Sequence, residues 1–223
     1  MIIDFKFEGK YVAMVGGGSE AFSKVQSFLD AGSKVLVISR NFSKGLLDLH
    51  ADKRIALFKT EIKDGEAFVK QLNPKPDLLA VATNDHKLNA KLAQCAKKEG
   101  FMVYVADNPA LSDFILPAVS KIGEVRIAVS TGGKSPAMAK TLRERIERLI
   151  TQQDLLQIEL QDYMRRVLKE RVTEQKTRKR ILYTILEDEP VNTLLKEGKL
   201  EKAKREAMEI MKNATKNTQE AQK

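Results

Sequence analysis

The sequence predicts an α/β fold in which a Rossmann-like parallel sheet is followed by a small β-containing segment and then by an all-helical C-terminal region. Up to residue 107, short apolar runs rich in β-branched residues recur about every 20–25 residues, which leaves room for a helix between successive strands. Residues 108–150 break this rhythm. Residues 151–223 contain one glycine and one proline and place apolar side chains at helical spacing. We therefore expect three parts, 1–107, 108–150 and 151–223.

Five apolar runs in the first part are predicted strands, and they cover residues 11–15, 34–38, 55–59, 78–82 and 102–105. Their nearly continuous hydrophobic character is typical of parallel strands that helices cover on both faces. The predicted helices between them cover residues 21–31, 64–72 and 86–99, with a shorter one near 43–50.

After residue 105 the predicted elements change in kind. Residues 114–121 and 124–130 are predicted as two strands separated by Ile122 and Gly123. Residues 135–150 are predicted as a helix that Ser135 caps, with Pro136 at its first position. Two or more helices follow, and the polar end of the chain, 212–223, is expected to fray.

Length and composition exclude several classes of protein. The chain has 223 residues, of which 43% are hydrophobic and 31% charged, so it can form a folded core and is not wholly disordered. It has no apolar run of about 18 residues, which argues against a membrane span. Residues 1–30 lack the pattern of a secretory signal and Cys95 is the only cysteine, so we expect a cytoplasmic protein. With His50 and His86 as the only histidines, a Cys/His metal site is not expected.

The chain is basic, with 39 Lys and Arg against 30 Asp and Glu and a formal net charge of +9. This charge favours anionic partners, namely nucleic acids, phosphate-bearing cofactors or polycarboxylates, although general solubility explains it equally well. The densest basic patch is 176–180, for which a solvated helix face is the plainer interpretation. Tryptophan is absent and 6% of residues are aromatic, which leaves little material for base stacking, so no nucleic-acid partner is expected.

A glycine-rich turn follows the first predicted strand. Gly16, Gly18 and Ala21 fit the pattern G-x-G-x-x-A, between a predicted strand and a predicted helix as the motif requires. Gly16 permits the tight turn, Gly18 lets a pyrophosphate approach the backbone, and Ala21 lets the helix pack closely on the strand. The helix N-terminus then offers free N–H groups to the phosphates. The pattern predicts a dinucleotide site, with a turn that binds no ligand as the alternative.

The end of the second predicted strand bears on the choice of dinucleotide. An acid here would bind the ribose of NAD, but the sequence has Ser39, Arg40 and Asn41. Arg40 could bind the 2′-phosphate of NADP or be a plain surface residue, and Asn41 could hydrogen-bond to either ribose. The preference between NAD and NADP stays open.

Polar residues also follow the fourth predicted strand, at the sheet edge where open α/β folds bind ligands. Thr83 and Asn84 could line the nicotinamide side of the site. Alternatively, Asn84 or Asp85 simply caps the helix that begins near His86. A lone histidine in that first turn is expected to be a polar surface residue.

Five motifs occur in order along the chain, and they are VGGG at 15–18, ATND at 82–85, VADNP at 105–109, FILP at 114–117 and STGGKSP at 130–136. Together they resemble the N-terminal region of siroheme synthases, the precorrin-2 dehydrogenase family, whose members are often also sirohydrochlorin ferrochelatases. The resemblance covers about residues 1–210, and the last three motifs are far more specific than the glycine turn. The methyltransferase module of the fused members is missing, so the chain resembles the stand-alone form.

The resemblance implies an NAD-dependent enzyme that oxidises precorrin-2 to sirohydrochlorin and in some members then inserts Fe²⁺. It implies a homodimer in which 108–150 is the dimerisation segment. Four residues match the dinucleotide-contact positions of the family: Ser19, Glu20, Arg40 and Asn41. Asp107 matches its essential aspartate, to which proton removal and metal insertion are assigned. A carboxylate at the sheet edge is a suitable proton acceptor, although Asp is also common in turns such as the one before Asn108 and Pro109.

The loop before the predicted helix at 135–150 is the candidate substrate-binding segment. Its glycines, its amides and a lysine could hold a carboxylate of the macrocycle, and the residues concerned are Thr131, Gly132, Gly133 and Lys134. A plain capping loop is the alternative. For the protein as a whole, the main alternative function is a nucleotide-sensing regulatory module without catalysis, which the glycine turn alone would fit equally well.

Overall fold

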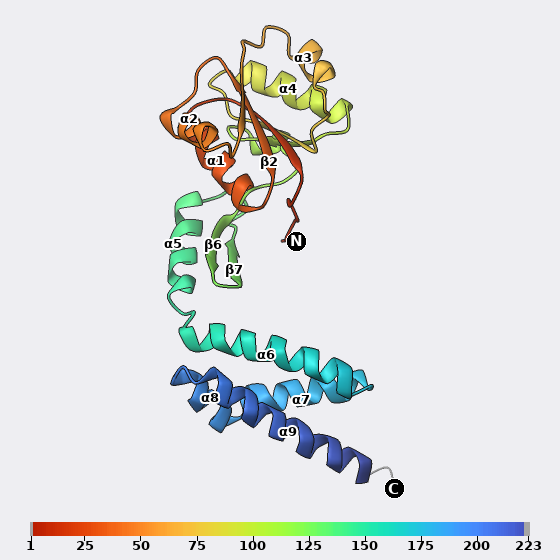
Figure 1. Cartoon of the computed structure of the whole chain (residues 1–223). Coiled ribbons are helices and arrows are strands. Elements are labelled where there is room, and N and C mark those ends of the chain that lie inside the picture. The colour runs from red at the N-terminus through yellow and green to blue at the C-terminus, as the bar shows by residue number, and fades with distance from the viewer. Residues whose placement is uncertain (1, 221–223) are drawn as a thin grey trace. The chain divides into compact units, whose positions relative to one another are not determined.

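The computed structural model describes residues 2–220, with side chains up to residue 216. The chain divides into two units, Met1–Leu116 and Pro117–Lys223. In Figure 1 the first unit contains the parallel sheet, and the second contains a β-hairpin and a group of helices. Each unit is built around hydrophobic side chains of its own.

The first unit holds a parallel sheet of five strands in the order β3-β2-β1-β4-β5. All five predicted strands are confirmed, with ends that differ by at most one residue, and they are β1 (Tyr11–Val15), β2 (Lys34–Ser39), β3 (Ala56–Lys59), β4 (Leu78–Val81) and β5 (Met102–Val105). Val15 pairs with Ile38 on one side and with Val81 on the other. The carboxyl ends of β1, β2 and β4 therefore meet at one edge of the sheet.

Helices cover both faces of this sheet, as the apolar strands require. One face packs against α1 (Ser19–Asp30) and α2 (Lys44–Ala51), and the other against α3 (Gly65–Gln71) and α4 (His86–Lys98) (Figure 1). Side chains of β1 alternate between the two layers, because successive strand residues point to opposite faces. Thus Val12 and Met14 join the layer of α1 and α2, whereas Ala13 and Val15 join that of α3 and α4.

The segment after β5 corrects one prediction. Residues 114–121 do not form a single strand, because Phe114 and Leu116 pack against the core of the sheet and the strand starts only at Ala118. The ring of Phe114 stacks on Tyr104 at 5.8 Å, and the Asp113 N–H donates to the Val103 carbonyl at 2.9 Å. Burial of these apolar side chains outweighs their local preference for a strand. The first unit consequently extends to Leu116, past the limit expected at residue 107.

The second unit begins with an antiparallel hairpin of β6 (Ala118–Ile122) and β7 (Val125–Val129), on which α5 (Pro136–Glu147) packs. Ser135 caps α5 through a hydrogen bond that its Oγ accepts from the Met138 N–H at 3.2 Å. The predicted helix here is therefore confirmed, although it ends at Glu147.

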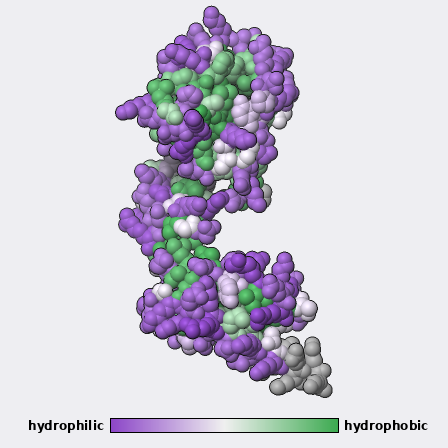
Figure 2. Space-filling model, viewed as in Figure 1, coloured by the Kyte–Doolittle hydropathy of each residue, from purple (hydrophilic) through white to green (hydrophobic). Residues whose placement is uncertain are grey.

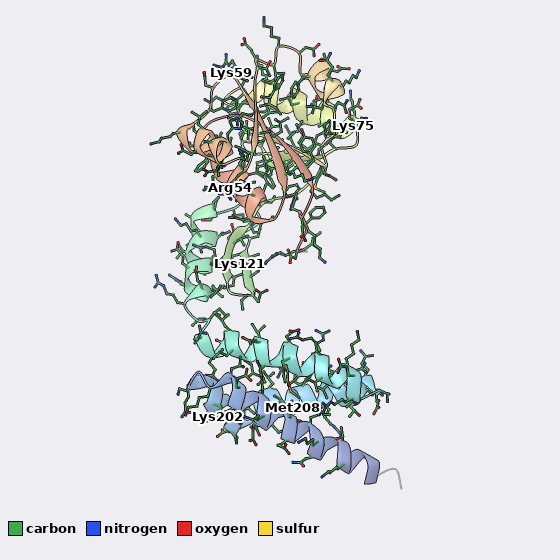
Figure 3. The ribbon with its side chains drawn as sticks, viewed as in Figure 1. Arg54, Lys59, Lys75, Lys121, Lys202 and Met208 are labelled. Atoms are coloured by element: carbon green, nitrogen blue, oxygen red, sulfur yellow. The ribbon has the colours of Figure 1, made fainter. Side chains whose placement is uncertain are left out.

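Four more helices complete the second unit, α6 (Gln152–Arg171), α7 (Gln175–Glu187), α8 (Glu189–Lys196) and α9 (Leu200–Glu220). They enclose a core that includes Leu160, Leu168, Ile181 and Ile185, and Met208, labelled in Figure 3, packs against it. The polar segment from residue 212 belongs to α9, which continues to Glu220, and Ala214 still packs against this core, whereas fraying of this end stays a prediction. Residues 221–223 lie outside the described residues. No helix in the described range 2–220 is long and apolar enough to cross a membrane.

The core of the second unit yields a stability prediction. Ile185 on α7 is fully buried, so Ile185→Ala should leave a cavity and lower the free energy of unfolding of this unit by about 2–5 kcal/mol. The measurement is a urea titration followed by far-UV circular dichroism at one protein concentration. Leu186→Ala at the next position, where the side chain is 41% exposed, is the matched control and should cost less than about 1 kcal/mol. Equal losses in both variants would contradict the assigned core.

Candidate active site

A cleft of about 1090 Å³ lies at the carboxyl edge of the parallel sheet. The segments that follow β1, β2, β3 and β4 line it. The strand order reverses between β1 and β4, and open α/β sheets bind ligands at such a switch point. The structure brings together all the residues predicted to contact the dinucleotide, and these are Gly16, Gly18, Ser19, Glu20, Arg40, Asn41, Thr83 and Asn84.

Two glycines of the turn are required by close backbone packing. Gly16 has a φ of +127°, and a Cβ there would lie 2.3 Å from the carbonyl oxygen of Ala82. A Cβ on Gly17 would lie 1.9 Å from the carbonyl oxygen of Asn41. A Cβ on Gly18 would meet nothing within 4 Å, so this glycine leaves an open surface. The G-x-G-x-x-A motif does not include Gly17. This position requires glycine because its backbone lies against the segment that follows β2.

The first turn of α1 is free to bind an anion. The N–H groups of the first turn have no intrahelical acceptor, as in any α-helix. Gly18 occupies the N-cap position and has no side chain that could accept from them. The hydroxyl of Ser43 is buried within the same lining and has no hydrogen-bond partner among the described residues. Leaving a buried hydroxyl unpaired costs about 1–3 kcal/mol, which a polar ligand can recover. The open glycine, the uncapped helix and the unpaired hydroxyl fit the diphosphate and riboses of a dinucleotide.

Arg40 carries a partner that the sequence did not predict. Its Nη1 lies 3.2 Å from Glu61 Oε1, and both side chains are more than half exposed, so the pair contributes little to stability. Glu61 follows β3 and lines the cleft, so it places a carboxylate beside the guanidinium. The dinucleotide-binding pattern predicts an acid only directly after β2, whereas Glu61 comes from the segment after β3, so its sequence position alone does not identify it.

A hydrogen-bond network links the ends of β4 and β5 through α4. The buried amide of Asn89, which is 1% exposed, donates from Nδ2 to the carbonyl of Thr83 at 2.9 Å and to Asp107 Oδ1 at 3.0 Å. Its Oδ1 accepts from the Thr83 hydroxyl. The Thr83 hydroxyl in turn accepts from the Asp85 N–H at 3.1 Å. Asn89 therefore fixes the orientation of the Asp107 carboxylate.

The capping question at α4 is settled by Asp85. Its Oδ1 accepts from the N–H groups of Lys87 and Leu88, each at 3.0 Å, so Asp85 is the N-cap. Asn84 lines the cleft instead. Sequence analysis did not identify Asn89, although one signal was available. It is a polar residue on the apolar face of α4, in helical register with Leu92, Ala93 and Ala96, and such a residue needs buried partners.

Asp107 Oδ2 contacts His86 Nδ1. The side chain of Asp107 is 22% exposed and that of His86 is 79% exposed, so His86 is a surface residue as expected, but one that touches the candidate catalytic carboxylate. Partial burial raises the pKa of the Asp107 carboxyl, whereas the hydrogen bonds from His86 and Asn89 lower it, and the net direction is down. The carboxylate is therefore ionised at neutral pH. Among the described residues, His86 lines the cleft, whereas Asp107 lies outside its lining.

The predicted substrate loop belongs to the second unit. The Thr131 hydroxyl accepts from the Ser135 N–H and donates to the Ser135 carbonyl, both at 3.0 Å, so it closes the turn before α5. Gly132 and Gly133 have φ values of +62° and +79°, and Lys134 is exposed. These contacts are those of a capping loop, and binding of substrate by this loop stays a prediction. No group of three or more His, Cys, Asp or Glu side chains suited to hold a metal occurs within the described part of the chain.

Comparison with known proteins relates both units to one family. A family model described as "Putative NAD(P)-binding" matches residues 3–118, and one described as "Sirohaem biosynthesis protein central" matches residues 123–149. The chain is 34% identical over 199 residues to a siroheme synthase of Methylococcus capsulatus, covering 88% of this chain and 40% of that protein. It is 33% identical over 184 residues to a precorrin-2 dehydrogenase of Methanosarcina barkeri, covering 82% and 81%.

A solved structure shares the fold. It is entitled "SirC, precorrin-2 dehydrogenase", and it matches 94% of this chain and 99% of its own with a TM-score of 0.72 at 19% identity. The chain spans less than half of the siroheme synthase and about four-fifths of the Methanosarcina protein. With the glycine cleft, the Asp107 network and the STGGKSP loop in place, these matches show that the chain belongs to the precorrin-2 dehydrogenase family, the family of the siroheme synthase N-terminal region.

Proposed function

We propose that this protein oxidises precorrin-2 to sirohydrochlorin, with NAD as the hydride acceptor. The observation that carries the proposal is the ordered Asp107 carboxylate in contact with His86, which lines a cleft suited to a dinucleotide. The sequence match to a precorrin-2 dehydrogenase along most of its length supports the same reaction. A nucleotide sensor would have no need of an oriented carboxylate at this edge, and it is distinguished by binding NAD without oxidising any tetrapyrrole.

Each part of the cleft has a distinct task in this proposal. When bound, the nicotinamide of the dinucleotide accepts the hydride. The turn at Gly16 and Gly18 and the first turn of α1 hold the diphosphate by backbone N–H groups. Thr83 and Asn84 line the nicotinamide side, and Asp107 serves the proton half of the reaction. Glu61 beside Arg40 disfavours the extra phosphate of NADP, so NAD is the preferred cofactor.

The substrate carries many carboxylates, which suits the net charge of +9. We assign binding of one such carboxylate to the loop of Thr131, Gly132, Gly133 and Lys134, whose glycines leave open space around their backbone. Fe²⁺ is a candidate second substrate, because the same Asp107 could accept pyrrole protons while iron enters the macrocycle. A single assay tests both the oxidation and the insertion of iron, if Fe²⁺ is added once the absorbance change with precorrin-2 and NAD is complete. We place the reaction in the cytoplasm.

The first prediction concerns the glycine turn. Gly18→Asp should abolish dinucleotide binding while the fold is retained, because the added side chain enters open space and its charge repels the diphosphate. The measurement is NAD affinity by calorimetry, with the circular dichroism spectrum as the test of folding. Gly18→Asn adds a side chain of similar size without the charge, and it should keep more affinity than Gly18→Asp. Wild-type affinity in Gly18→Asp would remove the assignment of the turn.

The second prediction concerns Asp107. Asp107→Ala should bind NAD like the wild type but convert precorrin-2 at least 10²-fold more slowly, the effect typical of a lost acid–base group. The rate is followed by absorbance with NAD and, separately, with NADP, and the wild type should be faster with NAD. Turnover at the wild-type rate in Asp107→Ala would exclude a role for this carboxylate in the reaction.

The third prediction concerns assembly through 108–150. In the described structure Ala139 is the only buried residue of α5, while Val119 is 56% exposed, Met138 46% and Leu149 73%. Figure 2 shows apolar atoms over the end of α5 and the start of α6. We infer a homodimer that covers these side chains, with a mass by light scattering of twice the 25.1-kDa chain.

A variant pair tests which surface makes the dimer. Val119→Glu should shift the protein toward a single chain at micromolar concentration, because it would bury a charge in the interface. Leu47→Glu, at a 49% exposed apolar position on α2, is the control and should leave the mass unchanged. A wild-type protein that stays monomeric under these conditions would refute the homodimer.

A further inference from the structure

We propose that His86 is a catalytic residue, whose Nε2 takes the proton that leaves the tetrapyrrole, and that Asp107 is a positioning residue that holds the imidazole by accepting from its Nδ1–H. The inference deepens the proposed function and rests on it. It assigns the proton to His86 Nε2, whereas the sequence resemblance implied the carboxylate of Asp107 as the proton acceptor.

The contacts of Asp107 determine the form of the imidazole. Oδ1 of this carboxylate is occupied by the Asn89 amide at 3.0 Å, and Oδ2 contacts His86 Nδ1. An ionised carboxylate can only accept hydrogen bonds, so Nδ1 must carry the proton. In the neutral imidazole Nε2 is then an unprotonated base.

Exposure separates the two candidates for proton acceptor. The His86 side chain is 79% exposed and lines the cleft, whereas that of Asp107 is 22% exposed and is absent from the described lining. Both oxygens of Asp107 are already engaged by protein groups, while the Nε2 of His86 has no hydrogen-bond partner among the described residues. Of the two side chains, His86 is therefore the more accessible proton acceptor.

Proton affinity favours the same assignment. The hydrogen bonds from His86 and Asn89 offset partial burial and lower the pKa of Asp107, which makes its carboxylate a weak base. An imidazole exchanges protons near neutral pH, where general bases are most effective. The charged side chains that face the same cleft are Glu20 from α1, Arg40 after β2, Glu61 after β3, Asp85 before α4 and Lys87 on α4. Asp85 is engaged by backbone N–H groups and Arg40 by Glu61.

The step balances as a dehydrogenation of a CH–NH unit of the macrocycle. The electron pair of the C–H bond leaves as hydride to the oxidised nicotinamide that the proposed function supplies. The N–H bond breaks, its electron pair becomes the new C=N bond, and its proton passes to Nε2 of His86. The imidazolium that results is stabilised by the adjacent Asp107 carboxylate, and it returns its proton to solvent because the ring is exposed.

The network also predicts what happens when Asp107 becomes asparagine. Asn89 donates to the oxygen at the Oδ1 position, so it retains the carbonyl oxygen of the new amide on that side. The NH₂ group then faces His86 Nδ1 and donates to it, which moves the imidazole proton to Nε2 and removes the base. In serine proteases the equivalent substitution reverses the tautomer and costs about 10⁴-fold in kcat.

The first arm of the test reads the tautomer in the free protein. The chain has two histidines, so ¹⁵N-histidine labelling gives two sets of ring signals, and His50→Gln assigns them. Above the pH range in which imidazoles are protonated, His86 should be the Nδ1–H tautomer in the wild type and the Nε2–H tautomer in Asp107→Asn. His50, whose Nδ1 lies 3.1 Å from the Ile55 carbonyl, should give the same signals in both proteins. An Nε2–H tautomer of His86 in the wild type would overturn the inference.

The second arm measures kcat/KM for precorrin-2 across pH. The wild-type value should fall toward acidic pH, because a protonated imidazole cannot accept the proton that leaves the substrate. His86→Gln should lower kcat/KM by about 10²–10⁴-fold and abolish that fall, with NAD affinity retained. His50→Gln is the control and should keep the wild-type profile. An active wild type with an equally active His86→Gln would overturn this inference alone, whereas a wild type that cannot oxidise precorrin-2 would overturn the proposed function and this inference with it.

Discussion

The close backbone contact at Gly16 and Gly17 is the constraint on which the site depends. These glycines bring the end of β1 against the carbonyl of Ala82 after β4 and the carbonyl of Asn41 after β2, at distances that no Cβ would permit. Three strand ends are thereby held around one opening, with the uncapped start of α1 beside them. The opening that we propose for the diphosphate is thus a product of backbone geometry, and few side chains are needed to form it.

Side-chain chemistry is added at the neighbouring strand ends through one buried amide. Asn89 engages Thr83 after β4 and Asp107 after β5, and all of its hydrogen-bonding groups find partners. An ordered buried network of this kind restricts each member to one orientation. The exposed imidazole of His86 is oriented by its contact with Asp107.

The parts of the fold that depend on local pattern could be predicted from the sequence. The apolar runs identify the parallel sheet because its strands are buried on both faces, and the glycine turn identifies the cleft because strand, turn and helix are contiguous. Contacts between distant segments could not be predicted in this way. Phe114 stacks on Tyr104 and is not part of the expected strand, and Glu61, which follows β3, pairs with Arg40, which follows β2. Asn89 has no local feature in the sequence that shows its contact with Asp107. Its partners, Thr83 and Asp107, lie just after β4 and β5.

The separate hydrophobic cores of the two units affect how a bound nucleotide protects the chain. A ligand that binds only the native cleft stabilises the part whose folding forms that cleft, by an amount that grows with the logarithm of its concentration. The core around Leu160 and Ile181 gains nothing directly from such binding. A nucleotide in the cleft therefore protects the first unit directly, whereas the C-terminal helices depend on the packing of their own core.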